Sequence, residues 1–211
     1  MVFKKEVLIN SLISEGWLKT DIIISAFRKV PREKFVPSEL KRFAYVDEPL
    51  PIGYGQTISQ PLTVAAMTEA LGPKKGDKIL EVGTGSGYQA AILSEIVGER
   101  GKIITTERIP ELVNFAKNNL KDYKNVYVVE YDGSKGYPEE APYDRIIVTA
   151  SAPKIPEPLI EQLKVNGRMV IPVGDMMFVV DKVKSSKNYE IKKKMIGYYV
   201  FVPLIGEYGY K

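Results

Sequence analysis

The residues best suited to chemistry form a glycine-rich turn that follows an acid. Glu81 and Val82 precede the segment Gly83-Thr84-Gly85-Ser86-Gly87. Glycines between a strand and a helix let the backbone approach a ligand closely and direct helix N–H groups toward it. The spacing is G-x-G-x-G, and the preceding carboxylate suits a ligand that carries an ammonium or sulfonium better than a pyrophosphate. A tight turn without a ligand is the simpler alternative.

Two later acids are placed as a nucleotide ligand requires. Glu107 ends the next expected strand, where an acid can accept both ribose hydroxyls. Asp132 and Gly133 end the third strand, where an adenine amino group would lie. Ligands of open α/β sheets bind outside the carboxyl ends of such strands. The combination resembles the first motifs of Rossmann-like methyltransferases, which implies S-adenosylmethionine as cofactor and S-adenosylhomocysteine as product.

The elements that must position these residues alternate between strands and helices. The pattern predicts helices in the first 45 residues and at 61–71, 88–97, 110–120 and 157–164, and strands at 78–82, 102–106, 125–130, 144–149, 168–173, 177–183 and 191–202. This alternation is typical of a parallel sheet with helices on both faces, and the last two strands predict an antiparallel hairpin. We therefore expect an α/β, Rossmann-like, seven-stranded methyltransferase fold with N-terminal helices.

The length of 211 residues fits one domain with one core. Within this single domain (1–211) we expect N-terminal helices and an active-site loop over 1–60, a cofactor-binding α/β core over 61–174, and a C-terminal hairpin and tail over 175–211. The Pro- and Gly-rich stretch from Asp47 to Pro61 has no clear period, which predicts a functional loop.

The composition excludes several kinds of chemistry. The chain has no Cys and no His, so it has no thiolate nucleophile, no Ser-His-Asp triad and no imidazole or thiolate metal ligand. Any chemistry must therefore use carboxylates, hydroxyls, amines, backbone groups or a bound cofactor, and we expect no metal. Lys and Arg number 30 against 26 Asp and Glu. This small surplus is only a weak argument for a nucleic-acid partner.

The expected location is the cytoplasm. The sequence has no uninterrupted apolar run long enough for a membrane span, and the first residues lack the apolar core of a signal peptide. We therefore expect no membrane partner. The lack of Cys and the abundance of Lys and Glu favour a heat-adapted source.

The missing residue types also narrow the methyl acceptor. Methylation of cytosine C5 requires a cysteine nucleophile, which is absent. Methyltransferases of the adenine amino group typically carry an Asn/Asp-Pro-Pro-aromatic tetrapeptide, but that position reads Thr149-Ala150-Ser151-Ala152-Pro153. A carboxylate is already ionised at neutral pH and needs no base, so its positioning would supply most of the rate.

Several segments together resemble one family, the protein L-isoaspartate O-methyltransferases. The most specific is the loop Pro49–Pro61 (PLPIGYGQTISQP). The others are Glu81–Ala90, Glu107-Arg108, Tyr143–Ala150 with Ala152–Pro156, Pro172–Gly174 and Phe201–Leu204, and the resemblance covers roughly residues 5 to 206. It implies methyl transfer to the free α-carboxylate of L-isoaspartyl residues in aged proteins and peptides, whose esters collapse to succinimide and begin repair.

The resemblance also implies residue roles. Ser59 is the catalytic position, whose hydroxyl would orient the substrate carboxylate. The implied cofactor contacts are Thr57, Ile58, Gly83, Thr84, Gly85, Glu107, Asp132 and Gly133, and the expected substrate contacts are the backbones of Ile52, Gly53, Tyr54 and Gly55 and of a strand with Tyr199, Val200, Phe201 and Val202.

Other interpretations of the same residues stay open. Ser59 could cap the helix that begins at Pro61, and Trp17 is expected in the core or in helix packing. The lysines at 182–187 and 192–194 could bind nucleic acid, although a solvated hairpin whose charges protect an edge strand is the favoured interpretation. The alternative functions are an RNA methyltransferase with the same cofactor half, and a cofactor-binding module without turnover.

Overall fold

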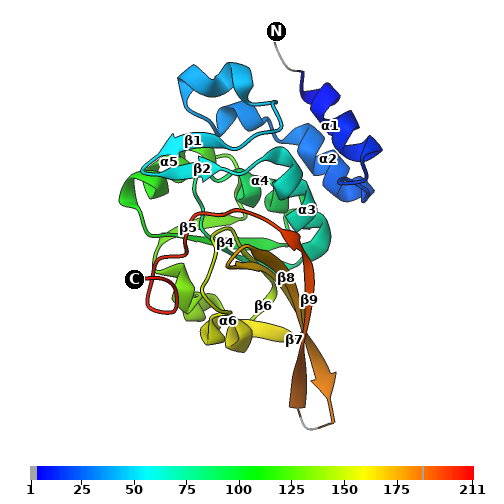
Figure 1. Ribbon diagram of the computed structural model, residues 1–211, viewed down its shortest axis with the longest axis vertical. Helices are drawn as coiled ribbons and strands as arrows, with labels where there is room; N and C mark the ends of the chain where they lie inside the picture. The colour runs from blue at the N-terminus through cyan, green and yellow to red at the C-terminus, as the bar shows by residue number, and fades with distance from the viewer. Residues whose placement is uncertain (1–3, 187) are drawn as a thin grey trace.

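A seven-stranded sheet lies at the centre of the computed structural model, which describes residues 4–186 and 188–211 (Figure 1). Its strands are β3 (Lys78–Val82), β4 (Lys102–Glu107), β5 (Val126–Glu130), β6 (Tyr143–Val148), β7 (Leu163–Val173), β8 (Met176–Ser185) and β9 (Asn188–Tyr198). They are ordered β5-β4-β3-β6-β7-β8-β9, with β8 and β9 antiparallel to their neighbours and the rest parallel. The predicted mostly parallel sheet with a terminal antiparallel hairpin is confirmed.

In the described part of the chain, six α-helices accompany this sheet. They are α1 (Lys5–Ser14), α2 (Asp21–Lys29), α3 (Pro61–Leu71), α4 (Tyr88–Val97), α5 (Pro110–Asn119) and α6 (Glu157–Gln162), with short 3₁₀ turns at Arg32–Lys34, Ser38–Phe43, Gly133–Lys135 and Pro138–Glu140. Apolar side chains of α1 to α5 form one core with one face of the sheet, and α6 packs on the other. In the described residues, 4–186 and 188–211, no helix is long and apolar enough to span a membrane.

Both faces of the central strands β3, β4 and β6 are buried, which explains their continuous apolar runs in the sequence. Successive residues of β3 alternate between the two cores: Ile79 belongs to the α1–α5 side, and Leu80 belongs to the α6 side. Both are fully buried. Parallel strands covered by helices on both faces show this pattern, and their carboxyl ends are left as the open edge where a ligand can bind.

The segment expected to be a loop before α3 is a small hairpin instead. Strands β1 (Leu50–Gly53) and β2 (Gln56–Ile58) pair in antiparallel register. The turn residues Tyr54 and Gly55 have φ values of 54° and 69°. Positive φ at both central residues is the geometry of a tight hairpin turn. Strands of four and three residues, the first of which contains Pro51, carry too little periodicity to be recognised in the sequence.

Two other boundaries differ from the prediction. Strand β7 begins at Leu163, inside the expected helix 157–164, because Leu163 pairs with the buried Tyr143. The register then shifts before Arg145 pairs with Arg168, and Asn166 in between has a φ of 67°. The last strand ends at Tyr198 and does not continue to Val202. The Tyr199 N–H donates to the Asp175 carbonyl (2.8 Å), and the Val202 carbonyl accepts the Ser151 N–H (2.8 Å). Residues 199–202 are therefore an extended segment across the end of the sheet.

The lysine-rich hairpin β8–β9 projects away from the rest of the molecule (Figure 1). Lys192, Lys193 and Lys194 are exposed on the edge strand, as expected. Lys182 is different, because it is only 5% exposed and its ammonium donates to the carbonyls of Ile160 and Leu163, both at 2.8 Å. It serves the carboxyl end of α6 and is neither solvated nor free to bind phosphate. Lys187 lies outside the described residues.

Candidate active site

The glycine turn between β3 and α4 is held by the neighbouring strands. The N–H groups of Gly83 and Thr84 donate to the Thr106 carbonyl of β4 (2.9 and 3.0 Å). The Thr149 hydroxyl, just after β6, donates to the Gly83 carbonyl (2.7 Å). Gly83 has a φ of +96°, and a Cβ there would lie 2.4 Å from the Thr149 hydroxyl oxygen. Any side chain at this position would therefore disrupt the turn.

Glu107 fixes the same turn from the end of β4. Its carboxylate accepts the N–H groups of Gly85 (3.0 Å), Arg108 (2.8 Å) and Ile109 (3.0 Å). The side chain is 7% exposed and faces a cavity at the end of the sheet. An ionised carboxylate has about four acceptor positions. Glu107 can therefore accept a ligand hydroxyl while it holds the turn.

Glu81 is a buried acid with an unused acceptor. The Thr105 hydroxyl donates to its Oε2 (2.5 Å), while Oε1 has no hydrogen-bond partner among the described residues. Burial raises the pKa of Glu81 to about 8, against the opposing hydrogen bond from Thr105, and nearby Glu107 raises this pKa further. Because Glu81 lines the cavity, the free oxygen suits a cationic ligand group.

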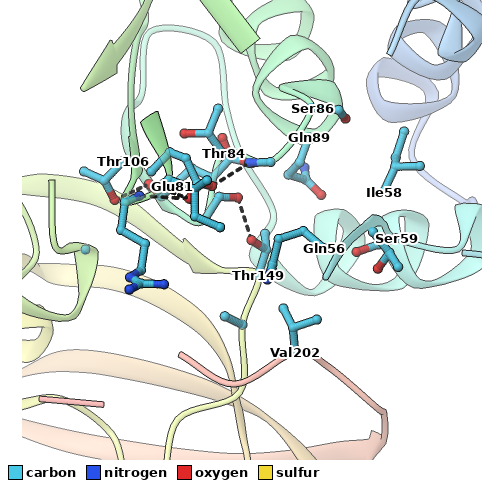
Figure 2. A pocket seen from close by; sticks show the side chains of 18 of the residues that line it. Gln56, Ile58, Ser59, Glu81, Thr84, Ser86, Gln89, Thr106, Thr149 and Val202 are labelled. Atoms are coloured by element: carbon cyan, nitrogen blue, oxygen red, sulfur yellow. Dashed lines mark hydrogen bonds between the residues drawn. The ribbon is translucent and has the colours of Figure 1, made fainter. Parts of the chain in front are cut away.

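These residues enclose one cavity, shown from close by in Figure 2. Glu81, Thr84 and Thr106 lie along one side of it, and Gln56, Ile58 and Ser59 lie on the other side near α3. The cavity brings together seven of the eight residues predicted to bind the cofactor, together with the predicted catalytic Ser59: Thr57, Ile58, Gly83, Thr84, Gly85, Glu107 and Gly133.

Asp132 is the exception, because it does not line this cavity. Its Oδ1 accepts the N–H (3.0 Å) and the hydroxyl (2.7 Å) of Ser134. Its Oδ2 accepts the N–H of Glu207 (2.9 Å). The carboxylate thus caps the 3₁₀ turn after β5 and binds the C-terminal segment. A contact between Asp132 and adenine stays a prediction.

A second cavity of about 830 Å³ opens beside the first. Its walls include Tyr199, Val200, Phe201 and Val202, all predicted to bind substrate. The other predicted contacts do not line it. Ile52 is buried under the β1–β2 hairpin against Gly85, and Gly53, Tyr54 and Gly55 form the exposed hairpin tip. We call this second cavity the groove.

Ser59 lies where the cavity and the groove meet. Together with Thr57, Thr149 and Val202 it lines both. The alternative role of Ser59 as a helix cap is wrong, because the N-cap of α3 is Gln60. The first turn of α3 is held instead by Asp47, which accepts the Leu62 N–H (2.8 Å) and the Gln60 side-chain amide (3.0 Å).

Several lining residues have no clear signal in the sequence. The sequence predicts Trp17 in the core or in helix packing, but this side chain is 37% exposed and lines the groove opposite the 196–202 segment. Tyr131 and Ile205 line the cavity but belong to no recognised motif. Thr149 lies in the segment Tyr143–Ala150, which contributes to the family resemblance. Only the structure shows that its hydroxyl donates to the glycine turn.

The residues around the cavity fit S-adenosylmethionine. Glu81 Oε1 is an unpartnered buried acceptor for a cationic group, and Glu107 has acceptor capacity left for hydroxyls. The glycine turn has no side chain between its backbone and a ligand at the ends of β3 and β4. This site on an open parallel sheet defines the class of Rossmann-like, S-adenosylmethionine-dependent methyltransferases.

Comparison with known proteins gives the particular family. A model of the "Protein-L-isoaspartate(D-aspartate) O-methyltransferase (PCMT)" family matches residues 3–209. The chain belongs to this protein-L-isoaspartate(D-aspartate) O-methyltransferase family.

The curated relatives of this chain are named as members of this family. The chain is 58% identical to protein-L-isoaspartate O-methyltransferase 2 of Archaeoglobus fulgidus over 210 residues, which cover 99% of this chain and 95% of the relative. It is 54% identical to the protein-L-isoaspartate O-methyltransferase of Methanopyrus kandleri over 211 residues, 98% of this chain and 93% of the relative. Many of the relatives come from thermophilic archaea, as the composition suggested.

Two solved structures that resemble this chain belong to the same family. A protein-L-isoaspartate O-methyltransferase with 32% sequence identity superposes with a TM-score of 0.84 over 98% of this chain and 67% of that one. A Plasmodium falciparum structure described as a protein-L-isoaspartate O-methyltransferase, in complex with S-adenosyl-L-homocysteine, is 26% identical, with a TM-score of 0.81 over 94% of this chain and 96% of that one.

Proposed function

We propose that the cavity and the groove are the two halves of one reaction site. In it the chain transfers a methyl group from S-adenosylmethionine to the free α-carboxylate of L-isoaspartyl residues in aged proteins and peptides, the first step of their repair through succinimide. The observation that carries this assignment is the position of Ser59, which lines both cavities. A carboxylate in the groove reaches the cofactor half at this residue.

The cofactor half would hold its ligand through groups that are already fixed. When bound, S-adenosylmethionine supplies an electrophilic methyl group on a sulfonium. Gly83, Thr84, Gly85 and Gly133 would contact the cofactor, Glu107 would accept the ribose hydroxyls, and Thr57 and Ile58 would line the side next to the groove. Glu81 Oε1 would face the cationic end, where the buried carboxylate gains a partner.

The substrate half would orient an acceptor that needs no general base. The Ser59 hydroxyl donates to one oxygen of the isoaspartyl carboxylate and aims the other oxygen at the methyl group. No proton is removed, because the acceptor is ionised at neutral pH and the chain has no His or Cys to act as a base. Rate enhancement then comes mainly from orientation. We propose that this occurs in the cytoplasm without a metal ion or nucleic acid.

The test uses two peptides that differ only in isoaspartyl or aspartyl linkage. Methyl transfer from labelled S-adenosylmethionine should give base-labile label on the isoaspartyl peptide alone. Label on neither peptide, with cofactor binding intact and RNA binding that falls steeply with salt, would favour the RNA alternative.

A variant of Ser59 tests the assignment of the residue. Ser59→Ala should reduce kcat about 10- to 100-fold, because a hydrogen bond to a charged group is worth about 1.5–3 kcal/mol. The affinity for S-adenosylhomocysteine, measured by calorimetry, should change less than about twofold. A collapse of cofactor affinity would instead assign Ser59 to the structure of the β2–α3 connection.

A further inference from the structure

The last residues of the chain form a closed turn rather than a loose end. The Tyr210 N–H donates to the Leu204 carbonyl (2.7 Å), and the Gly206 N–H donates to the Tyr210 carbonyl (3.1 Å). Between them the Gly209 N–H donates to the Gly206 carbonyl (3.1 Å). We call residues 204–210 the C-terminal turn. In Figure 1 it lies beside the sheet, far from the projecting β8–β9 hairpin.

The C-terminal turn binds the loop that follows β5. Two of its N–H groups point into that loop: Glu207 donates to Asp132 Oδ2 (2.9 Å), and Tyr208 donates to the Ser134 hydroxyl (3.0 Å). That hydroxyl in turn donates to Asp132 Oδ1 (2.7 Å). Partial burial alone would raise the pKa of Asp132, but the hydrogen bonds from Glu207 and Ser134 lower this pKa below its ordinary value.

The C-terminal turn and the loop after β5 approach each other closely at Gly206. A Cβ on Gly206 would lie 2.1 Å from Asp132 Oδ1 and 2.5 Å from the Ser134 hydroxyl oxygen. An ion pair between Lys135 and Glu207 (2.5 Å) lies at the rim, where both side chains are substantially exposed. Exposed pairs contribute little, so the charge-assisted bonds to Asp132 carry most of the attachment.

The loop after β5 and the C-terminal turn both contribute residues to the wall of the cofactor cavity. Tyr131 and Gly133, on either side of Asp132, line it, and so does Ile205 from the C-terminal turn. The Leu204 N–H also donates to the Ser151 carbonyl beyond β6 (2.7 Å), which fixes the other end of the turn. One wall of the cavity is thus assembled from two segments that are far apart in the sequence.

We propose that the C-terminal turn is a positioning element of the cofactor site, which holds the 131–135 loop against Ile205 and thereby sets the affinity for S-adenosylmethionine and S-adenosylhomocysteine. The groove does not include the turn itself, so peptide recognition does not depend on it. The inference rests on the proposed function only in that the cavity must hold the cofactor.

The variant Gly206→Ala tests this role, because its methyl group would push the turn away from Asp132. The Kd for S-adenosylhomocysteine, measured by calorimetry, should rise about tenfold, which corresponds to about 1.4 kcal/mol. The KM for S-adenosylmethionine should rise similarly, while kcat and the KM for an isoaspartyl peptide stay within about twofold. A chain that ends after Gly206 removes the Glu207 and Tyr208 donors without adding a side chain, and it places its terminal carboxylate beside Asp132. The turn should detach in the same way, so the Kd and the KM for the cofactor should rise similarly.

Gly167→Ala is the matched control. Its Cβ would lie 2.8 Å from the Lys164 carbonyl oxygen, in β7 and away from both cavities. It should lower the melting temperature with no change in cofactor affinity. The proposal is overturned if Gly206→Ala and the shortened chain bind S-adenosylhomocysteine normally, if they raise only the peptide KM, or if Gly167→Ala weakens cofactor binding equally. Failure of the wild-type chain to methylate isoaspartyl peptides would instead contradict the proposed function.

Discussion

The two halves of the site are built differently. In the cofactor cavity, Glu81 and Glu107 are buried, and five hydrogen-bond donors on Gly85, Thr105, Arg108, Ile109 and Thr149 already hold its polar groups in place. In the groove, Val200 is 97% exposed and Tyr198 is 70% exposed. Asp175 is the only charged residue among those that line the groove in the described part of the chain.

This difference matches two kinds of recognition. Fixed acceptors in a buried site favour one ligand, because a molecule that leaves a desolvated polar group unpaired loses about 1–3 kcal/mol per group. An exposed groove with apolar side chains and few charges excludes few peptide sequences. Damaged aspartyl residues occur in many sequence contexts, so a groove that binds them, as proposed above, has to accept many peptides, whereas the proposed cofactor cavity has to select one ligand.

Among variants that test the difference between the cavity and the groove, Gly83→Ala is expected to have the largest effect on cofactor binding. The left-handed backbone costs a non-glycine residue about 1–2 kcal/mol, and the new methyl group would overlap the Thr149 hydroxyl. We expect the Kd for S-adenosylhomocysteine to rise at least about 100-fold, which is roughly 2.7 kcal/mol, and methyl transfer to fall close to background. Calorimetry and the isoaspartyl peptide assay measure both.

Gly76→Ala is the control that tests whether backbone strain alone explains the effect of Gly83→Ala. Gly76 has a φ of +84°, but a Cβ there meets nothing within 4 Å. This variant should lose a similar 1–2 kcal/mol of unfolding free energy and keep its cofactor affinity. Equal loss of affinity in both variants would show that Gly83 acts only through stability.

Glu107→Ala should have the next largest effect. Its removal leaves three N–H groups around the cavity without their acceptor and takes away the expected ribose contact. Cofactor binding should weaken by about 1–3 kcal/mol, with the peptide KM unchanged. Glu107→Gln, which keeps one acceptor oxygen, should recover part of the loss. Unchanged cofactor affinity in Glu107→Ala would remove this residue from the ribose role.

Glu81 predicts a pH dependence of stability. Its folded-state pKa of about 8 lies above the ordinary value of 4.5, so the folded chain holds this proton more tightly than the unfolded chain does. The contribution is complete below pH 4.5 and is lost as the pH rises through 8. Urea unfolding of the ligand-free protein between pH 5 and 9 should show a decline of up to a few kcal/mol, at about 1.4 kcal/mol per pKa unit.

Glu81→Gln should flatten this decline, since an amide has no proton to lose in that range. The variant also tests the cationic partner, because a cation beside Oε1 favours the ionised carboxylate. Cofactor binding at pH 7 should therefore release a proton in the wild type and not in Glu81→Gln. Calorimetry in buffers with different ionisation enthalpies measures the release. Equal proton uptake or release in both proteins would show that Glu81 does not face the cationic group.

The residues that line the cavity are easier to predict from the sequence than those that line the groove, for a physical reason. Gly83, Glu107 and Gly133 lie at strand ends, and strand order brings such ends to one edge of a parallel sheet. The groove has no comparable rule. Trp17, Asp175 and Tyr198 meet there only because the loop after α1 and the chain after β9 cross the same end of the sheet. Such long-range contacts leave no local periodicity.

Long-range contacts also explain two predictions that were wrong, the end of the last strand and the exposure of Lys182. A strand from 191 to 202 is expected because residues 195–202 are rich in β-branched and aromatic types. The backbones of Tyr199 and Val202 instead bond to Asp175 and Ser151 and not to β8. Lys182 reads as one of several solvated lysines, although its ammonium lies on the last carbonyls near α6. In both cases a distant backbone group competes with the local pattern.

The smallest expected effect separates the two parts of the predicted substrate surface. Tyr54 is 60% exposed at the hairpin tip and lines neither cavity, whereas Tyr198 is 70% exposed and lines the groove. Tyr198→Ala should raise the KM for every isoaspartyl peptide about two- to fivefold, or about 0.4–1 kcal/mol. Tyr54→Ala should leave KM unchanged. Because both tyrosines are similarly exposed, general surface effects cancel. A larger rise in KM for Tyr54→Ala would return the substrate contacts to the β1–β2 hairpin, as the sequence first indicated.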